Sequence, residues 1–510
     1  MQGTAVNNRR IAKNTIYIYI RTIVVLVVSL YTSRIVLEVL GAKDYGIYTV
    51  VGGIIALMGF FQAAQSKATS RFLTYELGQN GISGSLAKVF SASMSIHLIT
   101  ALIAIVLCET IGLWIIYHWT QIPPDRQTAA IIVYQFSILV FCIHLIRIPY
   151  DSVVIAHEEM SVFAYFSIIE AALQLGLVFI IKYAKTDSLI LYSALMALSA
   201  FILLILYYLY VKKKYPVYSF KFTWDKRISK GMLSFSGWTL FGSGANALSQ
   251  QGVSLLMNNF VGLIANAAMG LSNQVNVAVS KFVNGFTTAF TPQVIKLYAQ
   301  NDRQELNRLI SSSSKFSFAL CYIMVLPIFC NMEYILHLWL GNDIPGYTAG
   351  FCRMILICTL FDATTGVYNT AITATGKIKY YQIGISLSFS LDLLLSFIML
   401  YCGINPVLVF SSRILTRGVL NMIIGLYFTK RYTDFKIGTY VNRVLVRILL
   451  VILITGFLSY LIYVSTSGLS QFVLTSLFSI SSVLISVLYI LMTEGERNTV
   501  LSRIKKRFVK

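Results

Sequence analysis

The sequence predicts an all-α integral membrane protein, and two properties of the whole chain support this fold class. Of its 510 residues, 57% are hydrophobic and only 12% are charged, and the mean hydropathy is +0.73. A soluble domain has about 25% charged residues, so this chain has too few charges to cover a water-exposed surface. Long apolar runs also recur along the chain, most near the roughly 20 residues that a helix needs to cross a bilayer.

Fourteen apolar segments are long enough to be membrane-spanning helices. The first follows a basic stretch, as in a signal peptide, but it is too long for one and lacks a small-residue cleavage site, so we interpret it as a retained helix. The expected spans are 15–37, 46–66, 88–108, 129–149, 160–182, 188–211, 233–259, 266–290, 314–332, 350–373, 379–401, 405–428, 445–464 and 470–492.

The basic residues indicate the orientation of the chain. A net charge of +21 is also typical of nucleic-acid binding, but here the Lys and Arg residues lie between the apolar runs and form no compact basic face. With the N-terminus inside, 31 of the 41 Lys and Arg residues fall on the inner side and five on the outer side. The positive-inside rule therefore predicts that both termini are cytoplasmic.

A weak internal repeat relates the two halves of the chain. Sliding the sequence by 221 positions aligns Gly41 with Gly262 and Phe61 with Phe282. Six spans per repeat is an even number, so the repeats are parallel, with a central cavity expected between them. We expect an N-lobe at 1–211, a basic cytoplasmic inter-lobe loop at 212–232, a C-lobe at 233–430, two further helices in 431–492 and a basic cytoplasmic tail at 493–510.

Several charged residues lie inside the expected spans, where an unpaired charge is costly and should face a cavity or a partner. Arg21 lies in the first span, Lys281 in the eighth, and Arg413 and Arg417 in the twelfth. Asp392 and Arg413 lie at similar distances from the turn that joins their helices, which favours an ion pair between them. Arg417 lies about one turn deeper and is expected to be freer to meet a ligand.

The seventh and eighth spans carry polar residues at helical spacing. Amides and hydroxyls both donate and accept hydrogen bonds, which suits sugar hydroxyls, and Lys281 on the same face favours a water-filled wall. The alternative for the amides alone is hydrogen bonding between packed helices. The expected sugar-binding residues are Asn246, Gln250, Gln274 and Asn284.

Motifs for catalysis, nucleotide binding or metal binding are not found in the sequence. The seven cysteines form no CxxC pair, and no GxxxxGK[ST] motif occurs. We therefore expect a carrier or channel that is not an enzyme and needs no cofactor or metal. Three carboxylates in the spans, Glu170, Asp362 and Asp392, are candidates for ion coupling.

The end of the first span carries a specific motif. Residues 34–48 read RIVLEVLGAKDYGIY, with an arginine, a Leu-Gly pair, an acidic residue and then Tyr-Gly-x-Tyr; the sequence ATSRF follows at 68–72. This pattern resembles bacterial polysaccharide and O-antigen flippases, the Wzx-type lipid-linked oligosaccharide transporters of the multidrug/oligosaccharidyl-lipid/polysaccharide (MOP, MATE-like) exporter superfamily.

The resemblance implies two six-helix lobes around a cavity that opens alternately to each side of a bacterial inner membrane. It implies that undecaprenyl-pyrophosphate-linked oligosaccharide moves from the inner to the outer leaflet, with membrane lipids and polysaccharide polymerase or glycosyltransferase enzymes as partners and no nucleic acid. A pyrophosphate needs cationic groups, and the candidates are Arg21, Lys281 and Arg417, with Arg34 and Arg413 as further ones.

Two other functions remain open. A cation-coupled multidrug (MATE-like) exporter would share the fold, but the first span here offers Arg21 and no mid-membrane Asp or Glu, which disfavours a cationic substrate. A flippase for the peptidoglycan precursor would use similar chemistry, and the sequence does not separate it from a polysaccharide flippase.

Overall fold

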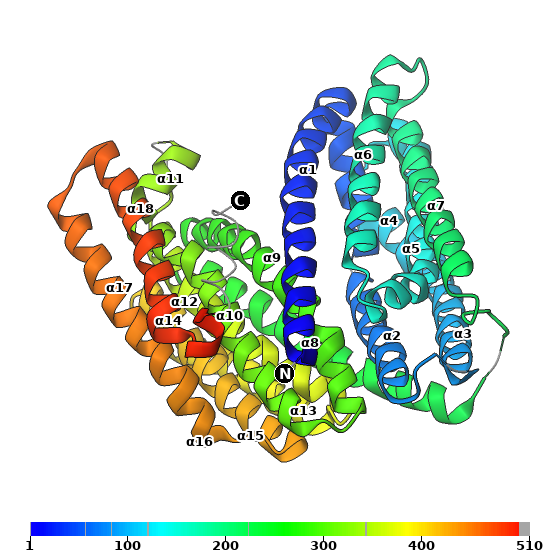
Figure 1. Ribbon diagram of the computed structural model, residues 1–510. Helices are drawn as coiled ribbons and strands as arrows, with labels where there is room; N and C mark the ends of the chain where they lie inside the picture. The colour runs from blue at the N-terminus through cyan, green and yellow to red at the C-terminus, as the bar shows by residue number, and fades with distance from the viewer. Residues whose placement is uncertain are drawn as a thin grey trace, which may run out of the picture. The chain divides into compact units, whose positions relative to one another are not determined.

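The computed structural model describes residues 2–56, 58–82, 84–119, 122–222, 224–341 and 344–498, and the regular elements in these ranges are all helices (Figure 1). In the first half they are α1 (Gln2–Ala56), α2 (Gly59–Asn80), α3 (Gly84–Leu107), η1 (Cys108–Gly112), α4 (Leu113–Trp119), η2 (Pro124–Arg126), α5 (Gln127–Ala156), α6 (Met160–Tyr183) and α7 (Ser188–Lys214).

The second half is also helical throughout its regular elements. They are α8 (Lys226–Phe260), α9 (Leu263–Ala299), α10 (Arg303–Cys330), α11 (Met332–Leu340), α12 (Thr348–Thr375), α13 (Lys379–Tyr401), α14 (Pro406–Arg413), η3 (Ile414–Leu420), α15 (Asn421–Thr433), α16 (Ile437–Tyr440), η4 (Val441–Leu445), α17 (Val446–Ser465), α18 (Gly468–Ser486) and η5 (Val487–Leu491). The segments η1, η3, η4 and η5 are π-helical, and η2 is a short 3-10 helix.

Ten helical segments of the described chain are long and apolar enough to cross a membrane. They coincide with ten of the fourteen expected spans, those from 88–108 to 188–211 and from 314–332 to 470–492. The other four expected spans fall in α1, across the junction of α1 and α2, in α8 and in α9. The polar residues of α8 and α9 make these helices less apolar than the ten, and the apolar stretch Asn14–Ser29 of α1 overlaps the first expected span.

The expected turn after the first span is reduced to a single residue. Gly41 has φ 73° and ψ 166° and interrupts α1, which is helical on both sides of it. Gly262, its counterpart in the internal repeat, has φ 107° and separates α8 from α9. Both values lie in a region that glycine enters far more readily than other residues, which gives the two aligned glycines the same structural reason to be present.

The chain divides into two units. Unit 1 consists of residues 1–240 and 291–300, and unit 2 of residues 241–290 and 301–510. Both α8 and α9 therefore begin in one unit and end in the other. Pro292 lies just past the point where α9 passes into unit 1, and a proline inside a helix removes one backbone hydrogen bond at that point.

Each unit has its own apolar core. In unit 1, α5 supplies fully buried Val133, Tyr134 and Leu145, packed with Val178 of α6 and Leu189 of α7. In unit 2, α8, α12 and α14 meet around residues that include Met257, Phe351 and Phe410. Lipid is as apolar as these side chains, so close packing is expected to hold helices of this kind together more than exclusion of water does.

Candidate functional site

A buried charge network in unit 2 is centred on Asp392 of α13. This side chain is fully buried, and its Oδ2 atom lies 3.0 Å from Nε of Arg417 and 3.6 Å from Nε of Arg413. Ser249 donates a hydrogen bond to the same oxygen (3.1 Å), and Thr416 donates one to Oδ1 (3.3 Å). Two guanidinium groups thus share one carboxylate, which leaves this group of three side chains with a positive charge in excess.

Arg417 is the more tightly held of the two arginines. Its Nη1 donates to Oδ1 of Asn246 (2.6 Å), its Nη2 donates to Oγ of Ser249 (2.9 Å), and its guanidinium lies over the ring of Phe389. The expected Arg413–Asp392 ion pair is present, but the expectation that Arg417 is the less engaged arginine is wrong. Sequence spacing gave the depth of each residue, whereas the partners on α8 depend on how α8 packs against α13.

Close packing of α8 on α13 explains why Asn246 and Ser249 reach this network. A Cβ atom added to Gly242 would lie 1.9 Å from Oε1 of Gln382, and one added to Gly252 would lie 2.7 Å from a methyl carbon of Leu393. The side chains of Gln382 and Leu393 therefore lie directly against the backbone of α8, and they would have to move if either glycine were replaced by a larger residue.

Arg413 is buried with unmet hydrogen-bonding capacity. Its side chain is 5% exposed and lies over the ring of Phe410, with 4.5 Å from Cζ to the ring centroid. Among the described residues, its Nε and Nη2 atoms have no hydrogen-bond partner. A buried guanidinium with free donors is costly, and a bound anion would recover part of that cost.

The polar residues expected on α9 lie on an exposed face. Gln274, Lys281 and Asn284 are all exposed, and within the described ranges Lys281 has no hydrogen-bond or ion-pair partner. Gln250 of α8 is also exposed and donates to Asn246 (3.3 Å). Asn246 therefore joins the exposed Gln250 to the partly buried Arg417, while Lys281 lies on a separate helix.

A second polar cluster lies in unit 1. Nη1 of Arg147 donates to Oε1 of Glu170 (3.1 Å), and Nε of Arg147 donates to Oδ2 of Asp151 (3.3 Å). Arg21 lies over the ring of Phe163 (4.8 Å), and its buried Nε has no hydrogen-bond partner among the described residues. The sequence pointed to Arg21 and Glu170 but not to Arg147; the i, i+4 spacing of Arg147 and Asp151 is the signal that reveals it.

The remaining expected residues are less informative. Asp362 of α12 is exposed and forms no hydrogen bond within the part of the chain that the structure describes. The side chain of Arg34 lies outside the described residues.

Asp44, within the motif at residues 34–48, takes part in an ion-pair network that the sequence did not predict. Arg126 of η2 binds both carboxylate oxygens of Asp44, one of them from Nε at 3.0 Å, and its Nη1 donates to Oδ2 of Asp187 at 2.5 Å. Asp187 also accepts hydrogen bonds from the backbone amides of Leu189 and Ile190, so it caps α7. Burial raises the pKa of Asp187, but these hydrogen bonds together lower it below its ordinary value.

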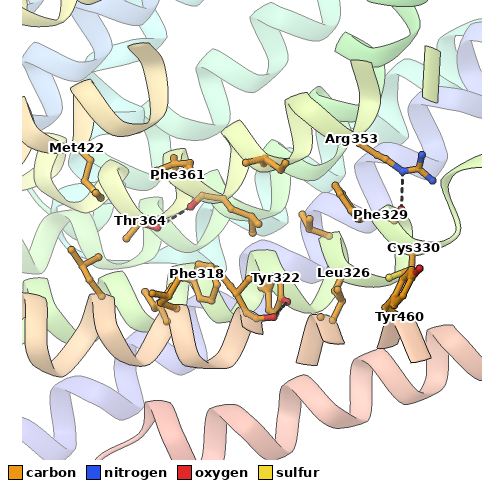
Figure 2. A pocket seen from close by; sticks show the side chains of 18 of the residues that line it. Phe318, Tyr322, Leu326, Phe329, Cys330, Arg353, Phe361, Thr364, Met422 and Tyr460 are labelled. Atoms are coloured by element: carbon orange, nitrogen blue, oxygen red, sulfur yellow. Dashed lines mark hydrogen bonds between the residues drawn. The ribbon is translucent and has the colours of Figure 1, made fainter. Parts of the chain in front are cut away.

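An apolar cavity of about 760 Å³ lies in unit 2 among α10, α12, α15 and α17. Figure 2 shows Phe318, Tyr322 and Leu326 along one side, with Met422 towards one end and Arg353, Cys330 and Tyr460 towards the other. Arg353 bonds to the carbonyl of Phe329 (3.4 Å) and to Glu333 (2.6 Å). The lining of the cavity is mainly apolar, and the arginine near one end is paired with a carboxylate.

Comparison with known proteins places the fold. Residues 230–403 match the MatE family model, and no curated protein matches the chain. A MATE structure in complex with MaL6 has a TM-score of 0.71 at 14% identity, covering 84% of this chain and 97% of its own. A MOP superfamily transporter from Pyrococcus furiosus gives 0.70 at 16%, and an outward-facing multidrug resistance MATE family transporter gives 0.69 at 14%; both cover 84% of this chain and 96% of their own.

These similarities cover most of the chain at low identity, and Asn246, Lys281 and Asp392 lie within the matched residues 230–403. The chain is therefore a multi-pass helical protein with the fold of MATE and MOP superfamily transporters, and its residues 230–403 carry the match to the MatE family model.

Proposed function

We propose that this protein is a flippase that moves undecaprenyl-pyrophosphate-linked oligosaccharide from the inner to the outer leaflet of a bacterial cytoplasmic membrane. It works by alternating access and supplies polysaccharide biosynthesis, with polymerase or glycosyltransferase enzymes as its partners. Its two termini are cytoplasmic. The fold of a membrane transporter and the motif at residues 34–48 support this proposal.

The exposed Lys281 is the observation that carries the proposal. In an expected membrane span, a lysine facing lipid would be costly, so its face borders water or a ligand. Gln274 and Asn284 lie on the same exposed face, one to two turns from it. A cation flanked by amides suits a substrate that joins an anionic phosphate to sugar hydroxyls.

The charge balance around Asp392 adds support for an anionic substrate. Arg413 and Arg417 share this single carboxylate, and Arg21 in unit 1 has a free donor among the described residues. We assign pyrophosphate binding to Lys281, Arg21 and Arg417, with Arg34 and Arg413 as further contacts, and sugar binding to Asn246, Gln250, Gln274 and Asn284. Arg417 and Asn246 take part only if the substrate replaces the hydrogen bond between them. The apolar cavity beside α17 offers room for part of a lipid chain.

Ion coupling is assigned first to Asp362, because it is exposed and free of hydrogen bonds within the described ranges. Glu170 and Asp392 already accept hydrogen bonds from arginines. They couple to ions only if substrate binding draws those arginines away.

A cation-coupled multidrug exporter is the second candidate, because one similar structure is a multidrug resistance MATE family transporter. Another, the Pyrococcus furiosus transporter, is described as having a binding pocket of reversed polarity that suggests a different function. The cation excess of the present chain favours an anionic substrate over a cationic drug. A peptidoglycan-precursor flippase would also carry an anionic lipid-linked substrate. It differs from the proposed flippase in the sugar that the lipid carries.

The test uses the purified protein in proteoliposomes with a fluorescent undecaprenyl-pyrophosphate oligosaccharide. Lys281→Ala should abolish flipping, Lys281→Arg should retain most of it, and Lys88→Ala, an exposed lysine on α3, should leave it unchanged. Full flipping by Lys281→Ala would remove the assignment of this residue. Movement of a cationic dye, or of the peptidoglycan precursor alone, by the wild-type protein would replace the proposed substrate.

A further inference from the structure

A second, polar cavity lies in unit 2, apart from the residues assigned to the transported substrate. It has a volume of about 380 Å³. Its walls come from the first turns of α10, from the corner between α15 and η4, and from the segment after η5. These walls lie at or near the ends of segments that are long and apolar enough to cross a membrane, and the ends of such segments are expected near the lipid head groups.

Four cations line this cavity. Lys315 is the buried one, with a side chain that is 7% exposed. Lys436 and Arg443 are exposed, and among the described residues their side chains have no ion-pair or hydrogen-bond partner. Arg308 is paired with Glu305 at 3.5 Å. The hydroxyls of Ser311, Ser312, Thr439 and Thr493 also line the cavity.

Glu496 is the single carboxylate among the lining residues. It accepts hydrogen bonds from Lys315 (2.8 and 3.1 Å), from Ser312 (3.2 Å) and from the backbone amide of Thr493 (2.8 Å). Burial raises the pKa of this carboxyl, but the bonds from Lys315 and Thr493 together lower it below its ordinary value. The chain thus fills part of a strongly basic cavity with its own anion, and the positive charge still exceeds the negative charge.

We propose that this cavity binds a phosphate group, with Lys436 and Arg443 as its main cationic contacts and the nearby hydroxyls as hydrogen-bond donors. Ammonium and guanidinium groups together with hydroxyls are the usual partners of phosphate oxygens. Glu496 competes with the phosphate for the positive charge of Lys315. The phosphate is that of an anionic phospholipid head group or a free phosphate, and this binding is separate from transport of the substrate.

Native mass spectrometry of the full-length protein in detergent tests the proposal, with phosphatidylglycerol, phosphatidylcholine and inorganic phosphate as probes. The wild-type protein should bind phosphatidylglycerol in preference to phosphatidylcholine. Lys436→Gln with Arg443→Gln should weaken that binding roughly 30-fold, the effect expected for two cations near a membrane surface. If free phosphate is the ligand, inorganic phosphate should bind in place of phosphatidylglycerol. Lys436→Gln with Arg443→Gln should then weaken the binding of inorganic phosphate by the same factor.

Lys226→Gln with Arg227→Gln is the matched control, because it removes two exposed positive charges from the start of α8, outside the lining of the cavity. Glu496→Gln removes the competing carboxylate and should strengthen binding, a gain that misfolding does not produce. The proposal is overturned if the cavity variant and the control lose lipid or phosphate binding equally. It is also overturned if binding of both phosphatidylglycerol and inorganic phosphate is independent of Lys436 and Arg443, or if Glu496→Gln fails to increase binding.

Discussion

At the scale of single residues, the arrangement around Asp392 explains how this chain keeps two arginines in its interior. The carboxylate of Asp392 pairs with Arg413 and Arg417, and it accepts hydrogen bonds from Ser249 and Thr416. Sequence spacing was enough to predict the pairing with Arg413, because the two helices are joined by a short turn. The bonds of Arg417 to Asn246 and Ser249 were out of reach, because α8 lies more than 160 residues away in the chain.

Asp392→Asn should therefore lower stability sharply. It leaves two buried guanidinium groups without a counter-charge, and removing one partner of a buried ion pair typically costs about 3–5 kcal/mol. Thermal unfolding of the purified protein in detergent measures the change. Asp225→Asn, at an exposed position that caps the start of α8, should have little effect because asparagine is an equally good cap. Equal melting of both variants would contradict a structural role for Asp392.

At the scale of helices and their connections, Arg126 joins three elements. It binds Asp44 just after the α1 break and Asp187 at the start of α7 from its own position in η2. The sequence predicted most of the helices, since apolar length decides them. It gave no indication of this junction, because the three residues lie 61 and 82 positions apart and their meeting depends on packing.

Arg126→Gln should lower the free energy of unfolding by about 1–2 kcal/mol, a moderate value because the three side chains are partly exposed. The pKa of Asp187 is lowered in the folded state. Its ionised carboxylate therefore contributes its full stabilisation above the unfolded pKa of about 3.9, and this stabilisation is lost as the pH falls through the lower folded pKa. Melting temperatures measured from neutral to acidic pH should fall less steeply in Arg126→Gln. Parallel curves for the two proteins would count against this junction.

At the scale of the whole molecule, the final segment of α9 is held within unit 1. Nζ of Lys296 donates to Oε1 of Glu158 (2.8 Å), and Gln293 donates to the other oxygen (3.2 Å). A Cβ atom on Gly78 of α2 would lie 2.8 Å from Cα of Lys296 and 3.2 Å from Cβ of Ala299. Positions 78 and 299 are equivalent under the repeat offset of 221, so corresponding parts of the two halves of the sequence touch here.

Glu158→Gln should loosen residues 291–300 from unit 1. The carboxylate is 3% exposed and pairs with Lys296, so its neutralisation should speed amide hydrogen exchange in 291–300 roughly tenfold, equivalent to about 1.4 kcal/mol of local stability. Residues 263–290 of the same helix should exchange as before. Glu494→Gln, at an exposed position, serves as the control, and an unchanged rate in 291–300 would refute the role of Glu158.

The division of α8 and α9 between the units determines what kind of backbone connects the units. The backbone passes from one unit to the other at 240–241, at 290–291 and at 300–301, and the first two passages lie inside continuous helices. At 240–241 and 290–291 the connection is therefore helical backbone rather than a loop. Within α9, Pro292 removes a backbone hydrogen bond beside the passage at 290–291, so this helix has less hydrogen-bond support close to the point where it changes unit.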